Sequence, residues 1–226
     1  DKPEKQQVAL TGSIIKELHK MAFTPLDITM CQLFTGAFFF AMRSCEYLKV
    51  SGTRCTKLLT LKNIRFFKGR RELHHSNKSL HKADSVSITF EFQKKDTRND
   101  TVTHHRSGHK SICPILVWAK IIQRIRNYPH STDNTPVNTF MDKNGRIHQI
   151  TGSQLLKCIR LAATAIGKDI LGFSPQDIGL HSARSGAAMA MFLAGVPVYT
   201  IMLLGRWSSD AFLRYIRKQV KEFSKG

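Results

Sequence analysis

The stretch His181-Ser-Ala-Arg184, followed by Gly205-Arg-Trp-Ser-Ser209 and Phe212-Leu-Arg-Tyr-Ile-Arg217, decides the fold predicted for this chain. His181 and Arg184 stand three residues apart in a segment rich in Ala, Met and Leu. On a helix their side chains would share one face, so two groups able to handle protons or phosphate would point the same way. Ser208 or Ser209 can then cap a further helix that carries Tyr215 between basic residues.

These three motifs occur in an order that resembles a known family. His-x-x-Arg, then Leu-Gly with Arg206, then a tyrosine nine residues further on is similar to the C-terminal half of the tyrosine recombinase (phage-integrase-like) catalytic domain. The segment 205–217 looks most like the eukaryotic branch of Cryptons and tyrosine-recombinase retrotransposons. The resemblance implies an α+β fold, mainly helical with a small antiparallel three-stranded sheet.

An earlier segment, Ala41-Met-Arg-Ser-Cys-Glu-Tyr-Leu48, resembles the first box of the same family, Arg-x-x-Glu-Leu. By that match Arg43 is the first phosphate-binding arginine and Glu46 is the acidic residue that orients the site. The alternative is a helix-end arginine that favours the helix dipole and pairs locally with Glu46.

Residues 86–92 alternate between apolar and polar side chains and form the clearest predicted strand, residues 61–67 are a candidate first strand, and residues 101–105 return as a third. The family places a small sheet here with a lysine at its hairpin. Lys94 or Lys95 would be that active-site lysine, and Lys94 is preferred because it follows the strand directly. Helices are expected at residues 14–19, from Pro25 to about Tyr47, at 115–126 and at 155–166.

The charge of the chain indicates a polyanionic partner. Its 226 residues carry a formal net charge of +19, and 42% of them are hydrophobic. A globular protein this basic favours nucleic acid over a membrane surface, although a merely basic protein, such as a ribosomal one, has the same composition. Residues 68–82 read as an insert that contacts the DNA backbone. The predicted DNA-binding residues are Arg70, Arg71, Lys78, Lys82, Arg106 and Lys110.

Cysteine and histidine spacing argues against a metal site or disulfide framework. The five cysteines contain no Cys-x-x-Cys pair, and the histidines at 74, 75, 81, 104, 105 and 109 match no ligand pattern. No apolar run reaches membrane-spanning length. We therefore expect an intracellular protein, nuclear if its host is eukaryotic, with no metal and no cofactor. Residues 1–226 are expected to form one catalytic domain, with 1–9 as a disordered or linker edge and no N-terminal core-binding domain.

The resemblance implies a covalent, metal-independent mechanism. Tyr215 would attack the scissile phosphate and form a 3′-phosphotyrosine, with Lys94 as general acid and His181 assisting proton transfer. Arg43 and Arg184 would bind the phosphate oxygens. The chain departs from the family at Arg206, where many members have His or Trp. Arg206 would be a further phosphate donor or would support Tyr215, with Trp207 as the alternative. Tyr47 and Tyr199 lie in apolar helical contexts and are expected in the core.

Three functions fit these features. The leading one is a recombinase or transposase domain that cuts and rejoins double-stranded DNA to integrate or excise a mobile element, acting as a tetramer when full length. The second is a type IB topoisomerase-like activity, which uses the same intermediate on a single duplex. The third is a domesticated DNA-binding module without cleavage, which retention of Arg43, Lys94, His181, Arg184 and Tyr215 disfavours.

Overall fold

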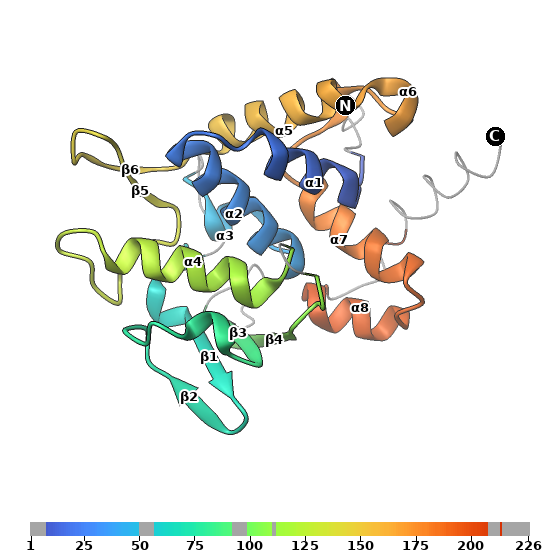
Figure 1. Cartoon of the computed structure of the whole chain (residues 1–226). Helices are drawn as coiled ribbons and strands as arrows, with labels where there is room; N and C mark the ends of the chain where they lie inside the picture. The colour runs from blue at the N-terminus through green and yellow to red at the C-terminus, as the bar shows by residue number, and fades with distance from the viewer. Residues whose placement is uncertain (1–7, 50–56, 92–98, 110–111, 208–212, 214–226) are drawn as a thin grey trace.

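Helices outnumber strands in the described residues, and a small sheet lies at one end of the molecule (Figure 1). The computed structural model describes residues 8–49, 57–91, 99–109, 112–207 and 213. Its helices are α1 (Gly12–Met21), α2 (Pro25–Phe39), α3 (Ser44–Tyr47), α4 (Pro114–Arg126), α5 (Gly152–Ile166), α6 (Lys168–Leu171), α7 (Ser182–Leu193) and α8 (Val198–Gly205). Its strands are β1 (Ile64–Lys68), β2 (Arg71–Leu73), β3 (Ser85–Phe90), β4 (Asp100–His105), β5 (Thr139–Met141) and β6 (Ile147–Gln149), and short 3-10 turns are η1 (Leu61–Asn63), η2 (Leu80–Lys82) and η3 (Pro175–Asp177).

Helix α2 lies at the centre of the helical part and contacts α1, α4, α5 and α7. It is apolar on nearly every side, as expected of a helix surrounded by others. Gly36 lies against the buried Trp118 ring of α4, where a Cβ atom would be 2.9 Å from Cε2. The close approach of α2 and α4 therefore depends on glycine at this position.

Helix α4 lies between α2 and the sheet, since it also contacts β3 and β4 (Figure 1). Within the described residues the sheet has four antiparallel strands in the order β2-β1-β3-β4. Ile64 pairs with Ile88, which pairs with Val102, and all three are buried. The helical layer and the sheet thus share one apolar core.

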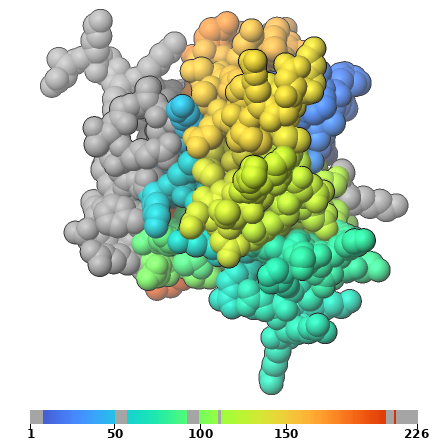
Figure 2. Space-filling view, turned by 90° about the vertical axis from the view of Figure 1, so that its left-hand side faces the viewer, coloured from blue at the N-terminus to red at the C-terminus, as the bar shows by residue number. Residues whose placement is uncertain are grey.

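The prediction of a three-stranded sheet was wrong, because the proposed insert at 68–82 supplies the strand β2. Lys68 pairs with Arg71 across a two-residue turn, and Gly69 takes a positive φ of 55° there. Turns of this length suit a twisted hairpin when glycine supplies positive φ. The hairpin and the residues after it protrude at one end of the molecule (Figure 2).

The prediction of one helix from Pro25 to about Tyr47 was also wrong. Helix α2 ends at Phe39, Ala41 takes a left-handed φ of 44°, and α3 begins at Ser44 with Arg43 as its N-cap. The segment 61–67 begins with η1, and only its second half forms β1. The other helices and strands predicted within the described residues are confirmed to within a few residues. The helix predicted to carry Tyr215, with Ser208 or Ser209 as its cap, lies outside the described residues. At the start of α5 the Thr151 Oγ1 accepts a hydrogen bond from the Gln154 N–H.

Candidate active site

Glu46 lies at the centre of a buried polar cluster, and its side chain is only 1% exposed. Its Oε1 accepts from Nη1 of Arg43 at 2.9 Å, and its Oε2 accepts from Nη2 of Arg206 at 2.8 Å. The backbone N–H of Arg43 also donates to Oε2, at 2.7 Å. This carboxylate therefore joins the start of α3 to the end of α8, which are about 160 residues apart in sequence.

Arg184 enters the same cluster from the first turn of α7. Its Nη1 donates to the carbonyl of Ala41 and its Nη2 to the carbonyl of Gly205, each at 2.5 Å. Its guanidinium carbon lies 4.2 Å from the centre of the Trp207 ring, which is cation–π contact. The side chain of Arg184 is thus held between the two segments that carry Glu46 and Arg206.

The backbone of both segments is strained beside this guanidinium. Ala41 (φ 44°) and Arg206 (φ 55°) occupy the left-handed region, which residues with a Cβ atom rarely adopt. Arg184 donates to the carbonyl of Ala41 itself and to the carbonyl of Gly205, the residue before Arg206. Strain of this kind is typical of functional sites.

Trp207 covers the end of α8. Its ring folds back over Gly205, where a Cβ atom would lie 1.6 Å from a ring carbon. The ring also packs on a small apolar cluster formed by Ala188 of α7 and Ile201 of α8. Glycine at position 205 is therefore required for Trp207 to reach both Arg184 and this cluster.

The cluster carries an excess of positive charge. The guanidinium groups of Arg43 and Arg206 contact the Glu46 carboxylate, and the guanidinium of Arg184 lies close enough for all three charges to act on it. Burial, with the charges of Arg206 and Arg43, lowers the pKa of Arg184 well below its usual range. Burial also lowers the pKa of Arg206 to about 10, although Glu46 acts in the opposite sense. Because guanidinium groups keep their proton in proteins, these shifts indicate a site that an anion would stabilise.

The other predicted site residues lie outside this cluster or outside the described residues. His181 is the N-cap of α7 and is exposed, whereas Arg184 is buried within the helix. Tyr215, Lys94, Lys95 and Lys110 lie outside the described residues. Tyr47 is buried as predicted, but Tyr199 is 71% exposed, contrary to its predicted place in the core.

The predicted DNA-binding residues within the described part of the chain are exposed and lie near the protruding hairpin. They are Arg70, Arg71, Lys78, Lys82 and Arg106. Arg106, just after β4, donates to the carbonyl of His81 in η2. This bond joins the far edge of the sheet to the turn that carries Lys82.

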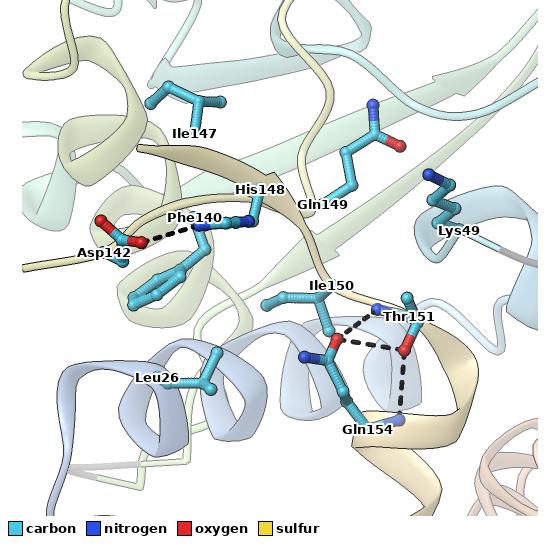
Figure 3. Close-up of a pocket in the computed structure, with 10 residues that line it drawn as sticks. All are labelled: Leu26, Lys49, Phe140, Asp142, Ile147, His148, Gln149, Ile150, Thr151 and Gln154. Atoms are coloured by element: carbon cyan, nitrogen blue, oxygen red, sulfur yellow. Dashed lines mark hydrogen bonds and ion pairs between the residues drawn. The ribbon is translucent and has the colours of Figure 1, made fainter. Parts of the chain in front are cut away.

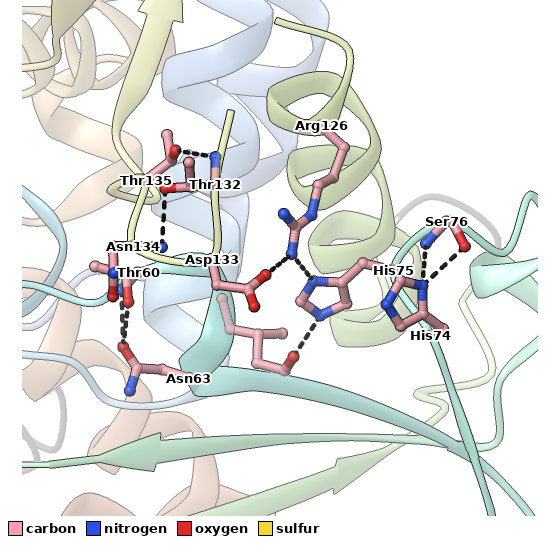
Figure 4. A network of polar contacts seen from close by, with 11 residues as sticks. Thr60, Asn63, His74, His75, Ser76, Arg126, Thr132, Asp133, Asn134 and Thr135 are labelled. Atoms are coloured by element: carbon pink, nitrogen blue, oxygen red, sulfur yellow. Dashed lines mark hydrogen bonds and ion pairs between the residues drawn. The ribbon is translucent and has the colours of Figure 1, made fainter. Parts of the chain in front are cut away.

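A polar network that no sequence motif marks anchors the same region to α4 (Figure 4). The ring of His75 contacts the Ile64 carbonyl through Nε2 at 2.6 Å and Arg126 through Nδ1 at 2.9 Å. Arg126, at the end of α4, also pairs with Asp133. The neutral Nε2–H tautomer satisfies both ring contacts, and burial lowers the pKa of His75. The basic hairpin is therefore fixed to the body of the domain.

A separate hollow of about 710 Å³ lies between the β5–β6 hairpin, Leu26 of α2 and the start of α5 (Figure 3). Its polar lining includes Lys49, Gln154 and the ion pair of His148 with Asp142. None of the predicted site residues lines it.

Among the described residues no group of three or more His, Cys, Asp or Glu side chains is placed to hold a metal ion. No helix in that part of the chain is long and apolar enough to cross a membrane.

Known proteins resemble this chain in fold. Two crystal structures of the XerH site-specific recombinase bound to difH substrate, one a pre-cleavage and the other a post-cleavage complex, each match it with a TM-score of 0.55. Each covers 99% of this chain at 14% sequence identity, and the chain spans 55% of the length of the XerH chain. No protein-family model and no curated protein matches the sequence. The chain therefore shares its fold with the XerH site-specific recombinase.

Proposed function

We propose that this chain is the catalytic domain of a DNA recombinase that cuts and rejoins strands through a covalent tyrosine intermediate. One observation carries the proposal: in a fold shared with XerH, Arg43 and Arg206 pair with Glu46, and Arg184 is held between the two segments that these residues join. The three guanidinium charges exceed the charge of Glu46, which suits a phosphodiester whose negative charge increases in the transition state.

Arg43 and Arg184 would bind the non-bridging oxygens of the scissile phosphate. Arg43 has the more accessible side chain, 22% exposed, and lies where a phosphate would enter from solvent. Arg184 lies deeper, fixed by Trp207 and two carbonyls. Guanidinium groups can hold two phosphate oxygens and remain charged throughout, so they can stabilise the transition state as a metal ion would.

Tyr215 would supply the nucleophile. Its phenolic oxygen forms a bond to phosphorus while the bond to the 5′ oxygen breaks, and a proton passes to that oxygen. Lys94, with Lys95 as the alternative, would donate this proton, and exposed His181 at the start of α7 would assist proton transfer. A second 5′-hydroxyl reverses the step, because the phosphotyrosyl bond keeps the energy of the broken phosphodiester.

Double-stranded DNA would lie over the protruding basic hairpin. Arg70, Arg71, Lys78, Lys82 and Arg106 are exposed there and can contact successive phosphates. The XerH structures hold DNA substrate, which supports the same partner for this chain. The same proposal includes three further points: the whole protein acts as a tetramer, it is located in the nucleus, and it integrates or excises a Crypton-like mobile element.

A denaturing gel can test the covalent step. The protein is incubated in EDTA with a pool of nicked duplexes whose central segment is randomised, and protein-linked DNA is recovered and sequenced. We expect a covalent adduct with the wild-type chain and with Tyr199→Phe, which removes an exposed tyrosine of α8, and no adduct with Tyr215→Phe. An adduct that requires metal, or one that persists in Tyr215→Phe, would contradict the proposal.

The same assay separates the competing functions. Joining of the recovered duplex to a second one indicates a recombinase, whereas relaxation of a supercoiled plasmid without such joining indicates topoisomerase-like activity. DNA binding with no adduct under any of these conditions would favour the non-cleaving DNA-binding module.

A further inference from the structure

We propose that Arg206 is a positioning residue, which fixes the start of the Tyr215 segment to residues 40–46 and does not itself bind the scissile phosphate. This inference rests on the function proposed above and assigns one role within that site. Arg206 occupies a position where the resemblance suggests a phosphate-contacting side chain, but its surroundings point to a different task.

The backbone of Arg206 ends α8 in a conformation that disfavours arginine. Its φ of 55° and ψ of 46° are left-handed, and the N–H of Trp207 donates to the carbonyl of Met202 at 2.9 Å. Helices that end in this way usually have glycine at the left-handed position. An arginine there needs compensation from its side chain.

The side chain of Arg206 faces inward. Nη1 donates to the carbonyl of Phe40 at 3.1 Å, and Nη2 donates to Glu46 at 2.8 Å. The guanidinium carbon lies 3.5 Å from the centre of the Phe90 ring in β3, and the side chain is only 2% exposed. A phosphate arriving from solvent would therefore meet Arg43 before it could reach Arg206.

These contacts fix the segments that hold Arg43 and Arg184, the two residues proposed above to bind the phosphate. Arg184 donates to Ala41 and Gly205, which belong to the same two segments that Arg206 ties together. Tyr215 follows Arg206 by nine residues. Holding the end of α8 against residues 40–46 thus sets where the nucleophile segment starts relative to Arg43 and Arg184.

Arg206→Gly tests this role, because glycine suits the left-handed backbone while the guanidinium is lost. Arg206→Lys keeps a charge beside Glu46, but one ammonium cannot reproduce the planar fork that reaches Phe40 as well. His130→Gly is the matched control, since His130 is an exposed residue with φ 59° far from the cluster in sequence. The duplex recovered from the adduct assay serves as substrate for single-turnover cleavage and for anisotropy titrations.

We expect Arg206→Gly to lower the single-turnover rate of adduct formation about 100-fold, the scale of a misplacement of roughly 1 Å. DNA affinity and its salt dependence should match those of the wild-type chain. The rate of adduct formation by Arg206→Lys should lie between the rates of the wild-type chain and Arg206→Gly, and His130→Gly should cleave at the wild-type rate. If Arg206→Gly does not fold, as judged by thermal melting, the rate and affinity of Arg206→Lys decide the question in the same way.

Two results would overturn the inference. A parallel loss of DNA affinity and of salt dependence would make Arg206 a direct phosphate contact. Cleavage at the wild-type rate by either variant would show that the tie is not needed. A wild-type chain that forms no adduct would instead refute the proposed function on which the inference rests.

Discussion

The guanidinium of Arg184 lies 4.2 Å from the centre of the Trp207 ring, and the ring in turn covers Gly205. This arrangement places an aromatic face against a buried arginine of the candidate site. It also makes Gly205, which has no side-chain functional group, essential to the site.

Gly205→Ala should therefore disturb the site without changing its chemistry. The new methyl group would lie 1.6 Å from a carbon of the Trp207 ring, so the ring has to leave Arg184. We expect about 1–3 kcal/mol loss in the free energy of unfolding and a lower rate of adduct formation. Gly12→Ala in α1 is the control, because no atom lies within 4 Å of its added Cβ. Equal urea melts for both variants would contradict the observed contact.

Gly36→Ala probes the fold away from the site. Its Cβ would lie 2.9 Å from the buried Trp118 ring, where α2 and α4 meet. Overpacking of this kind costs about 1–3 kcal/mol. Urea denaturation should show a lower midpoint with an unchanged slope. A variant as stable as Gly12→Ala would show that the two helices do not approach this closely.

Stability should fall in mild acid, and His104 should account for a large part of the fall. Burial lowers the pKa of His104 to about 4, and its Nε2 has no hydrogen-bond partner. Since the folded state favours the neutral ring, the stabilisation is complete above the unfolded pKa of about 6.5 and is lost as the pH falls toward 4. The difference corresponds to roughly 3 kcal/mol.

Urea melts across this pH range can test the assignment. His104→Phe should retain the edge-on contact with Phe40, whose ring centre lies 4.6 Å away, and should lose stability less steeply in acid. His75 and His19, whose pKa values are also lowered by burial, should leave a residual slope. An unchanged pH profile in His104→Phe would refute the role given to this ring.

The protruding hairpin should contribute phosphate contacts to DNA binding. Arg70→Ala and Arg71→Ala should each weaken binding and reduce the slope of log K against log salt by about 1. Lys168→Ala, which removes an exposed lysine of α6, is the charge-matched control. Fluorescence anisotropy at several salt concentrations measures both quantities. Equal slopes in all three variants would mean that DNA does not reach the hairpin.

Sequence periodicity and motif order were sufficient to predict the larger helices and strands and the arginine and glutamate residues of the buried polar cluster. Helix α4 has a continuous apolar face, and the sequence of β3 alternates between apolar and polar residues, so both elements were predicted. The motifs containing Arg43, Glu46 and Arg184 are far apart in sequence, yet the resemblance grouped them and the structure brings them together.

Other features depend on tertiary contacts that no local pattern reveals. Ala41 has no glycine or proline signal, although its left-handed backbone ends α2 and separates it from α3. Strand β2 is only three residues long and mostly charged, so it shows no alternation. Arginine is normally exposed, and the burial of Arg206 is explained by its contacts with Glu46, Phe40 and Phe90, which are distant in sequence.

The proposed function is tested most directly by asking whether Arg184 acts on the charge of the scissile phosphate. Wild-type and Arg184→Ala chains, checked by thermal melting, are compared on the recovered duplex and on the same duplex with a neutral methylphosphonate at the cleaved position. If the arginine offsets negative charge, Arg184→Ala should be slower by about 10²–10³ on the natural phosphate, and most of this deficit should disappear on the neutral linkage. An equal deficit on both substrates would contradict a phosphate-binding role for the cluster.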